Sequence, residues 1–402
     1  MTDMIERAEA QPLIVPPQPT GRRLVTFHPD VRPADAVKAL ASACGTEDVA
    51  RSSGFTASEQ DWRGGQDVVL LDRFGLAAIG GDFARASACA ANLQAMDEVV
   101  DTRPEFWMFT AYGPPWIDSA GSTWGRDAIG LPGSGATGEG VKLAILDTGI
   151  DLGHPDFAGR QIVTQSLVSG QTVHDVRGHG THCAGTAAGA VRGGGNVPPY
   201  GVAPNARLHV GKVLDDSGAG RELDIIAGIE WAIQQDCAIV SMSLGRPVRP
   251  EEPFDPLYEE VARRALEAGT LVIAAAGNES DRRYGYVAPV TAPANAPSIM
   301  AVAAVGADAG IATFSCGATG VGAVDVAAPG VGVFSSVPRP RLYRSLSGTS
   351  MACPHVAGVA ALWAESNPSL RGQALWDKVV NSAVPVGGLD RRDVGRGLVQ
   401  AP

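Results

Sequence analysis

The sequence predicts an α/β domain, built on a mainly parallel sheet with helices on both faces, that follows a small α+β domain. From residue 138 onward, apolar segments alternate with segments of helical spacing, as in parallel strands joined by helices. Apolar segments without a polar face indicate strands that are buried on both sides. The expected strands are 141–146, 208–214, 237–244, 270–276 and 299–305, and the helices between them are 223–235 and 256–269.

The small domain is expected at residues 24–110, where strand and helix patterns follow one another in the ferredoxin-like order βαββαβ. The segments are strand 24–28, helix 33–44, a hairpin of 68–73 and 76–81, helix 83–96 and strand 98–109. Residues 1–23 are polar and rich in proline, which predicts a disordered tail. Residues 111–402 are assigned to the second domain, which opens with a linker rich in Gly, Pro and Ser.

Composition and charge limit the classes of partner. The chain has 402 residues, with 32 Lys and Arg against 43 Asp and Glu, and a formal net charge of −11 repels the phosphates of nucleic acids. No segment approaches the run of about 18 apolar residues that spans a membrane. The first residues carry Asp3, Glu6 and Glu9 and lack the apolar core of a signal peptide. We therefore expect a cytoplasmic protein without nucleic-acid or membrane partners, and leave later export by another route open.

The cysteines show neither a CxxC motif nor the spacing of a zinc site. They are Cys44, Cys89, Cys183, Cys237, Cys316 and Cys353. Without a secretory signal, the expectation is six reduced and mostly buried thiols.

Four polar residues stand where a parallel sheet places its functional site, beyond the carboxyl ends of strands or at the start of a helix. Asp147 follows the strand 141–146, and Asn278 follows the strand 270–276. His179 opens H-G-T-H-C-A-G-T, and Ser350 lies in S-G-T-S-M-A-C-P-H-V-A-G, each at an expected helix start. Taken singly, an Asp after a strand is usually a turn former, and a Ser in such a segment is usually a loop or cap residue.

Together these segments resemble the subtilase, or subtilisin-like serine protease, family. The resemblance rests on three long motifs in the order Asp, His, Ser: D-T-G-I-D (147–151), H-G-T-H-C-A-G-T (179–186) and G-T-S-M-A-C-P-H-V-A-G (348–358). It covers about residues 120–401 and implies a subtilisin-like fold for the larger domain. It also implies that the domain at 24–110 is an inhibitory propeptide of a self-processing zymogen.

The resemblance implies a serine endopeptidase, and the chemistry explains the residue types. Ser350 would attack the peptide carbonyl, His179 would take its proton, and Asp147 would hold the imidazole. The Asn278 amide and the Ser350 backbone N–H would stabilise the oxyanion. This chemistry requires no cofactor.

The expected substrate is a peptide or protein in extended conformation, which can pair with a strand end of the enzyme. By resemblance, two segments bind it and line the pocket for the side chain before the scissile bond: Ser243, Leu244 and Gly245, and Ala275, Ala276 and Gly277. Self-cleavage is expected within 108–113, an apolar and aromatic stretch, which favours large apolar side chains before the cut. Glu279 near the pocket leaves a basic residue as the alternative.

Two other functions remain open at this stage. One is a non-catalytic binding module that keeps the fold, but the complete set of Asp147, His179, Ser350 and Asn278 argues against it. The other is a peptide cyclase or ligase of the same fold, in which inserted elements shield the acyl-enzyme from water. Only residues 148–178 separate Asp147 from His179, which leaves little room for such an insertion.

Three further residues lie close to the motifs. Cys183, four residues after the histidine, is expected to be a small buried hydrophobe, with a mercurial-sensitive or redox role as the alternative. His182 is expected to be structural, because H-G-T-H lacks the Glu of a zinc motif. Asp156 matches a calcium ligand of the family, but the loop 189–201 offers only Asn196 as a side-chain oxygen donor, so structural calcium stays an alternative.

Overall fold

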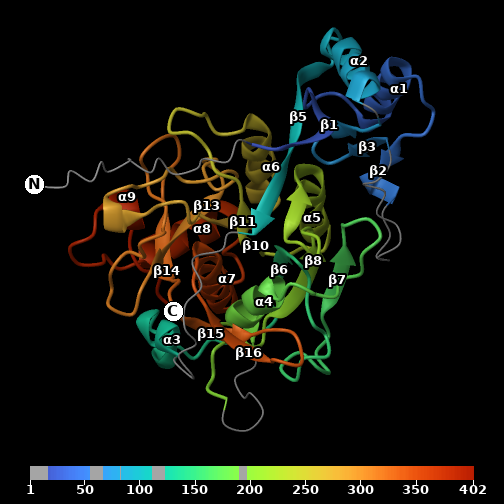
Figure 1. Ribbon diagram of the computed structural model, residues 1–402. Coiled ribbons are helices and arrows are strands. Elements are labelled where there is room, and N and C mark those ends of the chain that lie inside the picture. The colour runs from blue at the N-terminus through green and yellow to red at the C-terminus, as the bar shows by residue number, and fades with distance from the viewer. Residues whose placement is uncertain (1–16, 55–66, 82, 111–122, 190–196) are drawn as a thin grey trace, which may run out of the picture.

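The computed structural model describes residues 17–54, 67–81, 83–110, 123–189 and 197–402, which form a small and a large domain (Figure 1). The large domain is centred on a sheet of seven strands in the order β14, β13, β12, β10, β6, β8, β7, and every neighbouring pair is parallel. The strands are β6 (Lys142–Asp147), β7 (Val163–Ser166), β8 (Arg207–Lys212), β10 (Ile239–Met242), β12 (Leu271–Ala275), β13 (Met300–Val305) and β14 (Val326–Pro329). The predicted fold class is confirmed.

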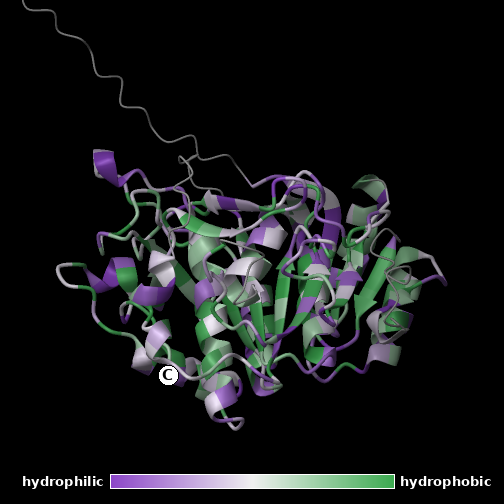
Figure 2. Cartoon of the chain, turned by 90° about the horizontal axis from the view of Figure 1, so that it is seen from below, coloured by the Kyte–Doolittle hydropathy of each residue, from purple (hydrophilic) through white to green (hydrophobic). Residues whose placement is uncertain are grey.

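Helices cover both faces of this sheet, and alternate strand residues point into two apolar cores. In β6, Ala144 and Leu146 lie in one core, and Leu143 and Ile145 lie in the other. The first core is covered by α5 (Glu222–Gln234) and α6 (Pro256–Glu267), and the second by α4 (His179–Ala188), α7 (Thr349–Ser366) and α8 (Gly372–Ser382). Hydrophobic residues are accordingly concentrated in the central strands (Figure 2).

Short elements complete the large domain. They are α3 (Trp124–Ala128), α9 (Arg391–Val394), β9 (Ala219–Arg221), β11 (Leu244–Gly245), the antiparallel pair β15 (Val333–Ser336) and β16 (Tyr343–Leu346), and 3-10 turns at Leu131–Gly133 and Arg282–Tyr284. The part of the chain that the structure describes contains no helix long and apolar enough to cross a membrane.

The small domain has the predicted βαββαβ order with one short strand added. Its elements are β1 (Pro19–Phe27), α1 (Pro33–Cys44), β2 (Ala50–Arg51), a 3-10 turn at Ser52–Gly54, β3 (Val68–Leu71), β4 (Leu76–Ile79), α2 (Phe83–Gln94) and β5 (Val99–Thr110). A separate apolar core, which includes Val25, Leu40, Leu70 and Leu93, lies between its helices and its sheet.

The N-terminal tail ends earlier than predicted. Residues 19–23 belong to β1, and Arg23 pairs with Ile79 of β4 and with Pro104 of β5. Arg22 is only 8% exposed, and its Nε lies 3.9 Å from a carboxylate oxygen of Glu105. The prediction of a tail over 1–23 is therefore wrong for 19–23, because backbone pairing and an ion pair hold a segment without an apolar pattern in the strand. Residues 1–16 lie outside the described residues.

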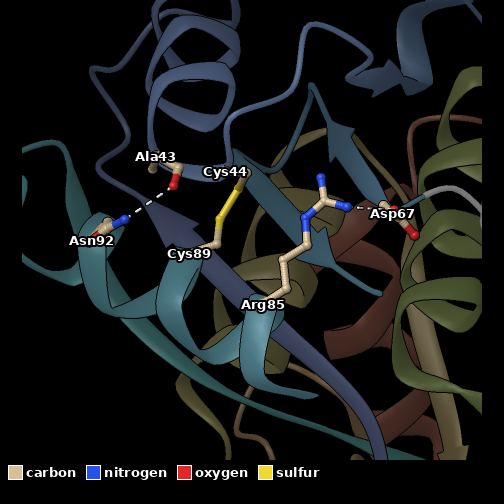
Figure 3. The surroundings of a disulfide bond; sticks show 6 residues. All are labelled: Ala43, Cys44, Asp67, Arg85, Cys89 and Asn92. Carbon is tan, nitrogen blue, oxygen red and sulfur yellow. Dashed lines mark hydrogen bonds and ion pairs between the residues drawn. A yellow bond between two sulfur atoms is a disulfide. The ribbon is translucent and has the colours of Figure 1, made fainter. Parts of the chain in front are cut away.

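A disulfide joins Cys44 at the end of α1 to Cys89 in α2, so the prediction of six reduced thiols is wrong for these two (Figure 3). The two helices pack together, their cysteine Cα atoms lie 4.8 Å apart, and the Asn92 amide donates a 3.2 Å hydrogen bond to the Ala43 carbonyl. Helix packing brings together residues 45 positions apart, which sequence spacing does not indicate. Cys183, Cys237, Cys316 and Cys353 are free and buried, as predicted.

The strand β5 connects the two domains. It pairs with β1 inside the small domain, and its last residues pair with β9 and β11 of the large domain (Figure 1). The predicted strand 237–244 accordingly divides at Ser243 into β10, which joins the central sheet, and β11, which pairs with β5.

Candidate active site

Asp147 and His179 meet at the carboxyl end of the central sheet. Asp147 is the last residue of β6, and His179 is the first residue of α4. Nδ1 of His179 lies 2.7 Å from Oδ1 of Asp147, and both side chains are completely buried. The backbone N–H of Thr148 donates to the same Oδ1 at 2.7 Å, which fixes the carboxylate. An imidazole that donates through Nδ1 carries its lone pair on Nε2.

Ser350, the second residue of α7, is brought to the histidine by the packing of α7 against α4. Cys183, which belongs to α4, contacts both residues. Its sulfur lies 3.5 Å from the Ser350 carbonyl oxygen and 3.9 Å from Nδ1 of His179. Burial raises the pKa of the Cys183 thiol well above its ordinary value. The thiol therefore stays protonated and fills space between the two residues, as predicted from its position after the histidine.

Asn278 faces the start of α7 with a fixed amide. Its Oδ1 accepts hydrogen bonds from the Thr349 backbone N–H and hydroxyl, at 2.9 and 3.0 Å. Oδ1 is thereby occupied, and Nδ2 is buried without a protein partner. A buried donor without a partner costs free energy unless another group accepts from it, so this amide is set up to bind an oxygen that arrives later.

The segment from Ser243 to Gly245 forms one wall of a groove in which β5 lies. Thr110 of β5 pairs with Leu244, and Phe109 pairs with Gly245. On its other side β5 pairs with β9, where Met108 lies opposite Gly220. Met108 is completely buried, whereas Phe109 is 40% exposed. An extended chain is thus held between two strands of the large domain.

The Ser243 residue connects this groove to Ser350. The Ser243 hydroxyl donates to the Ser350 carbonyl at 2.8 Å, and the Ser350 hydroxyl lies 3.3 Å from the Ser243 carbonyl oxygen. The chain that pairs with Leu244 and Gly245 therefore runs toward the Ser350 hydroxyl.

The second expected segment, Ala275 to Gly277, begins at the last residue of β12 and is buried. The Gly277 N–H donates to the Thr349 hydroxyl at 3.2 Å, and a Cβ at Gly277 would overlap Thr291 and Glu279. Glu279 accepts hydrogen bonds from the Asn278 N–H at 2.7 Å and the Cys316 thiol at 3.2 Å, and burial raises its pKa. The structure thus brings this segment to the start of α7, with Glu279 and Cys316 behind it.

His182 has the structural role that was predicted. Its Nε2 donates toward the carbonyl oxygens of Val333 and Arg344, at 3.0 and 3.2 Å. Burial lowers its pKa to about 3, so it stays neutral near neutral pH.

Asp156, the candidate calcium ligand, is held by two tyrosine hydroxyls. The Asp156 carboxylate accepts hydrogen bonds from the hydroxyls of Tyr200 and Tyr343. Burial raises the pKa of both tyrosines, that of Tyr343 to about 12, so both remain donors. The two hydroxyls use two of about four lone-pair sites of this carboxylate. Asn196 lies outside the described residues.

Among the described residues, a single cluster has three potential metal ligands close together: Asp147, His179 and Cys183. The hydrogen bond between Asp147 and His179 uses the atoms that would face an ion, and the Cys183 thiol is protonated. This chemistry fits a proton-transfer pair and does not fit a zinc site, where cysteine binds as the thiolate.

The sequence is matched by the family model of the subtilase family over residues 138–397. The chain belongs to the subtilase family. It is 38% identical over 274 residues to subtilisin E of Bacillus subtilis (strain 168), which covers 68% of this chain and 67% of that protein. It is 39% identical over 282 residues to subtilisin Savinase of Lederbergia lenta, which covers 69% of this chain and 96% of that protein. An alkaline protease of Alkalihalobacillus alcalophilus is 39% identical over 282 residues, or 69% of this chain and 68% of that protein.

This subtilase is a serine-type endopeptidase that acts on peptide substrates. The four residues singled out from sequence, namely Asp147, His179, Asn278 and Ser350, lie at one end of its sheet. Sequence reasoning missed the residues that orient them, above all Thr349, which fixes the Asn278 amide. Its only signal was its place directly before the serine.

Proposed function

We propose that Ser350 is the nucleophile of this endopeptidase and that His179 is its general base. The observation that carries the proposal is the contact of Nδ1 of His179 with Asp147, at 2.7 Å, beside the start of α7. This contact selects the tautomer whose Nε2 can take the Ser350 proton, and the Asp147 charge stabilises the imidazolium that results. His179 then gives the proton to the leaving amine, and water hydrolyses the acyl-enzyme by the reverse use of the same base.

The oxyanion of each tetrahedral intermediate is bound by Asn278 and the backbone N–H of Ser350. Support comes from Nδ2 of Asn278, which is buried without a partner among the described residues, and from the position of Ser350 in the first turn of α7, where the helix dipole favours negative charge. These donors and the three side chains supply the chemistry, so the reaction needs no bound cofactor.

The substrate binds as an extended strand along Leu244 and Gly245. β5 serves as the guide, since it lies antiparallel to β11 with Thr110 opposite Leu244. Leu244 follows Ser243, whose carbonyl oxygen lies 3.3 Å from the Ser350 hydroxyl. A substrate strand that pairs with Gly245 and then with Leu244 is therefore led toward the nucleophile.

The small domain acts as an intramolecular inhibitor that the enzyme removes. The occupation of the substrate groove by β5 supports this role, as do the side-chain contacts at the interface. Arg103 lies 2.9 Å from Glu222 and 2.6 Å from Asp255, and Glu105 accepts from the Leu223 N–H at the start of α5. Attachment within one chain raises the effective concentration of the inhibitor, so the uncut form should have little activity.

The end of β5 beside Leu244 supports self-cleavage within the window 108–113 that is expected from sequence, of which residues 111–113 lie outside the described residues.

One experiment tests the catalytic assignment and the processing together. The purified chain is followed by intact mass and by labelling with a fluorophosphonate, alongside Ser350→Ala. We expect a mass loss that corresponds to a cut within 108–113 and one label, on Ser350, in the wild type only. A wild type that stays uncut and fully active would overturn the inhibitor role, and label retained in Ser350→Ala would overturn the nucleophile assignment.

A further inference from the structure

The backbone is anchored on both sides of His179. The Gly178 N–H donates to Oδ1 of Asp175 at 2.7 Å, and the Gly180 N–H donates to the Thr148 hydroxyl oxygen at 2.9 Å. The Thr148 hydroxyl in turn donates to Oδ1 of Asp175 at 2.8 Å. The two amides that flank the histidine are therefore tied to one carboxylate, directly on one side and through Thr148 on the other.

The second oxygen of Asp175 holds the first turn of α4. Oδ2 accepts from the Thr181 backbone N–H at 2.8 Å and from the Thr181 hydroxyl at 2.6 Å. The side chain is completely buried. An ionised carboxylate accepts only, and four donors here converge on its two oxygens, in a position near a helix N-terminus that favours negative charge.

The same network reaches Asp147. The Thr148 N–H donates to Oδ1 of Asp147, which is the atom that contacts Nδ1 of His179. Gly180 lies so close to Gly149 that a Cβ at Gly180 would overlap the Gly149 carbonyl oxygen. This close approach keeps the start of α4 from moving toward β6. The hydrogen bonds that meet at Asp175 hold it against movement in the other directions, and the two together fix the geometry of Asp147 and His179.

We propose that Asp175 is a positioning residue of the endopeptidase reaction, which sets the orientation of His179 toward Asp147 and Ser350 through Thr148, Gly178 and Thr181. The inference rests on the proposed roles of the three catalytic residues. The hydrogen-bond partners of Asp175 are Thr148, Gly178 and Thr181, and none of them belongs to the strands β9 and β11 that hold an extended chain. Its loss should therefore lower kcat and leave KM nearly unchanged.

The test compares Asp175→Asn with a matched pair at Thr148. In Asp175→Asn one acceptor becomes an amide donor that faces the Thr181 N–H, and Thr148→Val removes the hydroxyl that joins Asp175 to Gly180. Thr148→Ser keeps that hydroxyl. A displacement of about 1 Å in a catalytic group costs on the order of 10²-fold, so we expect kcat to fall about 10- to 100-fold in Asp175→Asn and Thr148→Val. KM should stay within about twofold in both, and Thr148→Ser should restore most of kcat.

Active sites are counted by fluorophosphonate titration, so unfolded protein does not lower kcat. Asp151→Asn is the control, because Asp151 lies in the same D-T-G-I-D motif as Thr148 but its carboxylate pairs with Arg339 at 2.9 Å. We expect this variant to have a lower Tm and an unchanged kcat. The inference is overturned if Asp175→Asn has wild-type kcat, or if Thr148→Val and Thr148→Ser have equal kcat. The Thr148 pair decides the matter should Asp175→Asn fail to fold. Activity in a parallel Ser350→Ala sample would instead overturn the proposed nucleophile.

Discussion

Glu230 of α5 accepts a 3.0 Å hydrogen bond from the Ser52 hydroxyl across the interface between the two domains. The same oxygen, Oε1, accepts from the Arg73 N–H at 3.1 Å, whereas Oε2 is buried without a protein partner. Burial raises the pKa of Glu230 to about 7, and the nearby Asp72, itself paired with Arg51, acts in the same direction. The Arg73 charge acts in the opposite direction but does not outweigh burial.

This interface should therefore weaken as pH rises. Below pH 4.5, the ordinary pKa of a glutamate, Glu230 is protonated whether or not the small domain is bound. Between pH 4.5 and about pH 7, Glu230 loses its proton in the separated large domain but keeps it when the small domain is bound. Ionisation of Glu230 therefore favours separation of the two domains. Above pH 7 the effect is complete. The inhibition constant should rise with pH by up to about two orders of magnitude.

The measurement is the inhibition constant of the small domain, added back to the processed enzyme between pH 5 and 8. Glu230→Gln should flatten most of the pH dependence. Glu222, whose pKa burial also raises, accounts for a remaining slope of the same sign. Asp377→Asn, at an exposed position on α8, is the charge-matched control and should behave as the wild type. An equal slope in Glu230→Gln and the wild type would exclude Glu230 as its source.

Ser350→Ala, His179→Ala and Asp147→Asn should each abolish peptidase activity and leave the fold intact. The three side chains act in one step, so the double and triple variants should be hardly worse than the most severe single change. The quantity to compare is kcat/KM, with far-ultraviolet circular dichroism to show that each variant is folded. Losses that add independently would contradict a single coupled unit.

Asn278→Ala should lower kcat with little effect on KM, because its Nδ2 would bind an oxygen that becomes charged only during the reaction. The expected loss is about 10²–10³-fold, a magnitude measured in subtilisin itself for its corresponding donor. Thr349→Val removes one of the two hydrogen bonds that orient this amide, and Thr349→Ser keeps it. A smaller loss in Thr349→Val than in Asn278→Ala, and none in Thr349→Ser, is the expected order. A rise in KM with an unchanged kcat would argue against the oxyanion role.

The candidate site residues could be singled out from sequence because each of them stands in a long motif. Asp147 ends β6, His179 begins α4 and Ser350 lies in the first turn of α7, and the small residues that neighbour them appear in the sequence itself. Asp175 could not be found in the same way. It stands in the ordinary loop segment H-D-V-R-G, and its four donors, which come from Thr148, Gly178 and Thr181, converge only after folding.

The fold was predictable where the apolar pattern was strong. The five expected strands of the central sheet match, but β7 has the partly polar sequence V-T-Q-S, and β2 has only two residues, too few to show a pattern. The division of the predicted strand 237–244 at Ser243 could not be predicted either. β11 is separate from the central sheet because it pairs with β5 of the small domain. Contacts between domains, like the pairing of Cys44 with Cys89, depend on packing that no local pattern records.

Reduction of the Cys44–Cys89 disulfide should destabilise the small domain and with it the inhibited state. The bond closes a loop of 45 residues, for which chain entropy predicts a stabilisation of about 4 kcal/mol. That is a large share of the free energy of unfolding of a small domain. Cys44 is half-buried, so a thiol reductant can reach the bond, whereas the four free cysteines of the large domain are buried. A thermal melt of full-length Ser350→Ala should therefore show an earlier transition in dithiothreitol.

The double variant Cys44→Ser, Cys89→Ser in the same background should melt early with or without dithiothreitol. In the active enzyme, the same pair of substitutions should raise the inhibition constant of the small domain and speed its digestion, because an unfolded inhibitor is also a substrate. Cys237→Ser, at a buried free thiol of the large domain, serves as the control and should leave the reductant effect intact. If the wild-type disulfide is shown by mass to be reduced and the melt does not move, the bond does not stabilise the domain, and its apolar core with the contacts of β5 suffices to hold the fold.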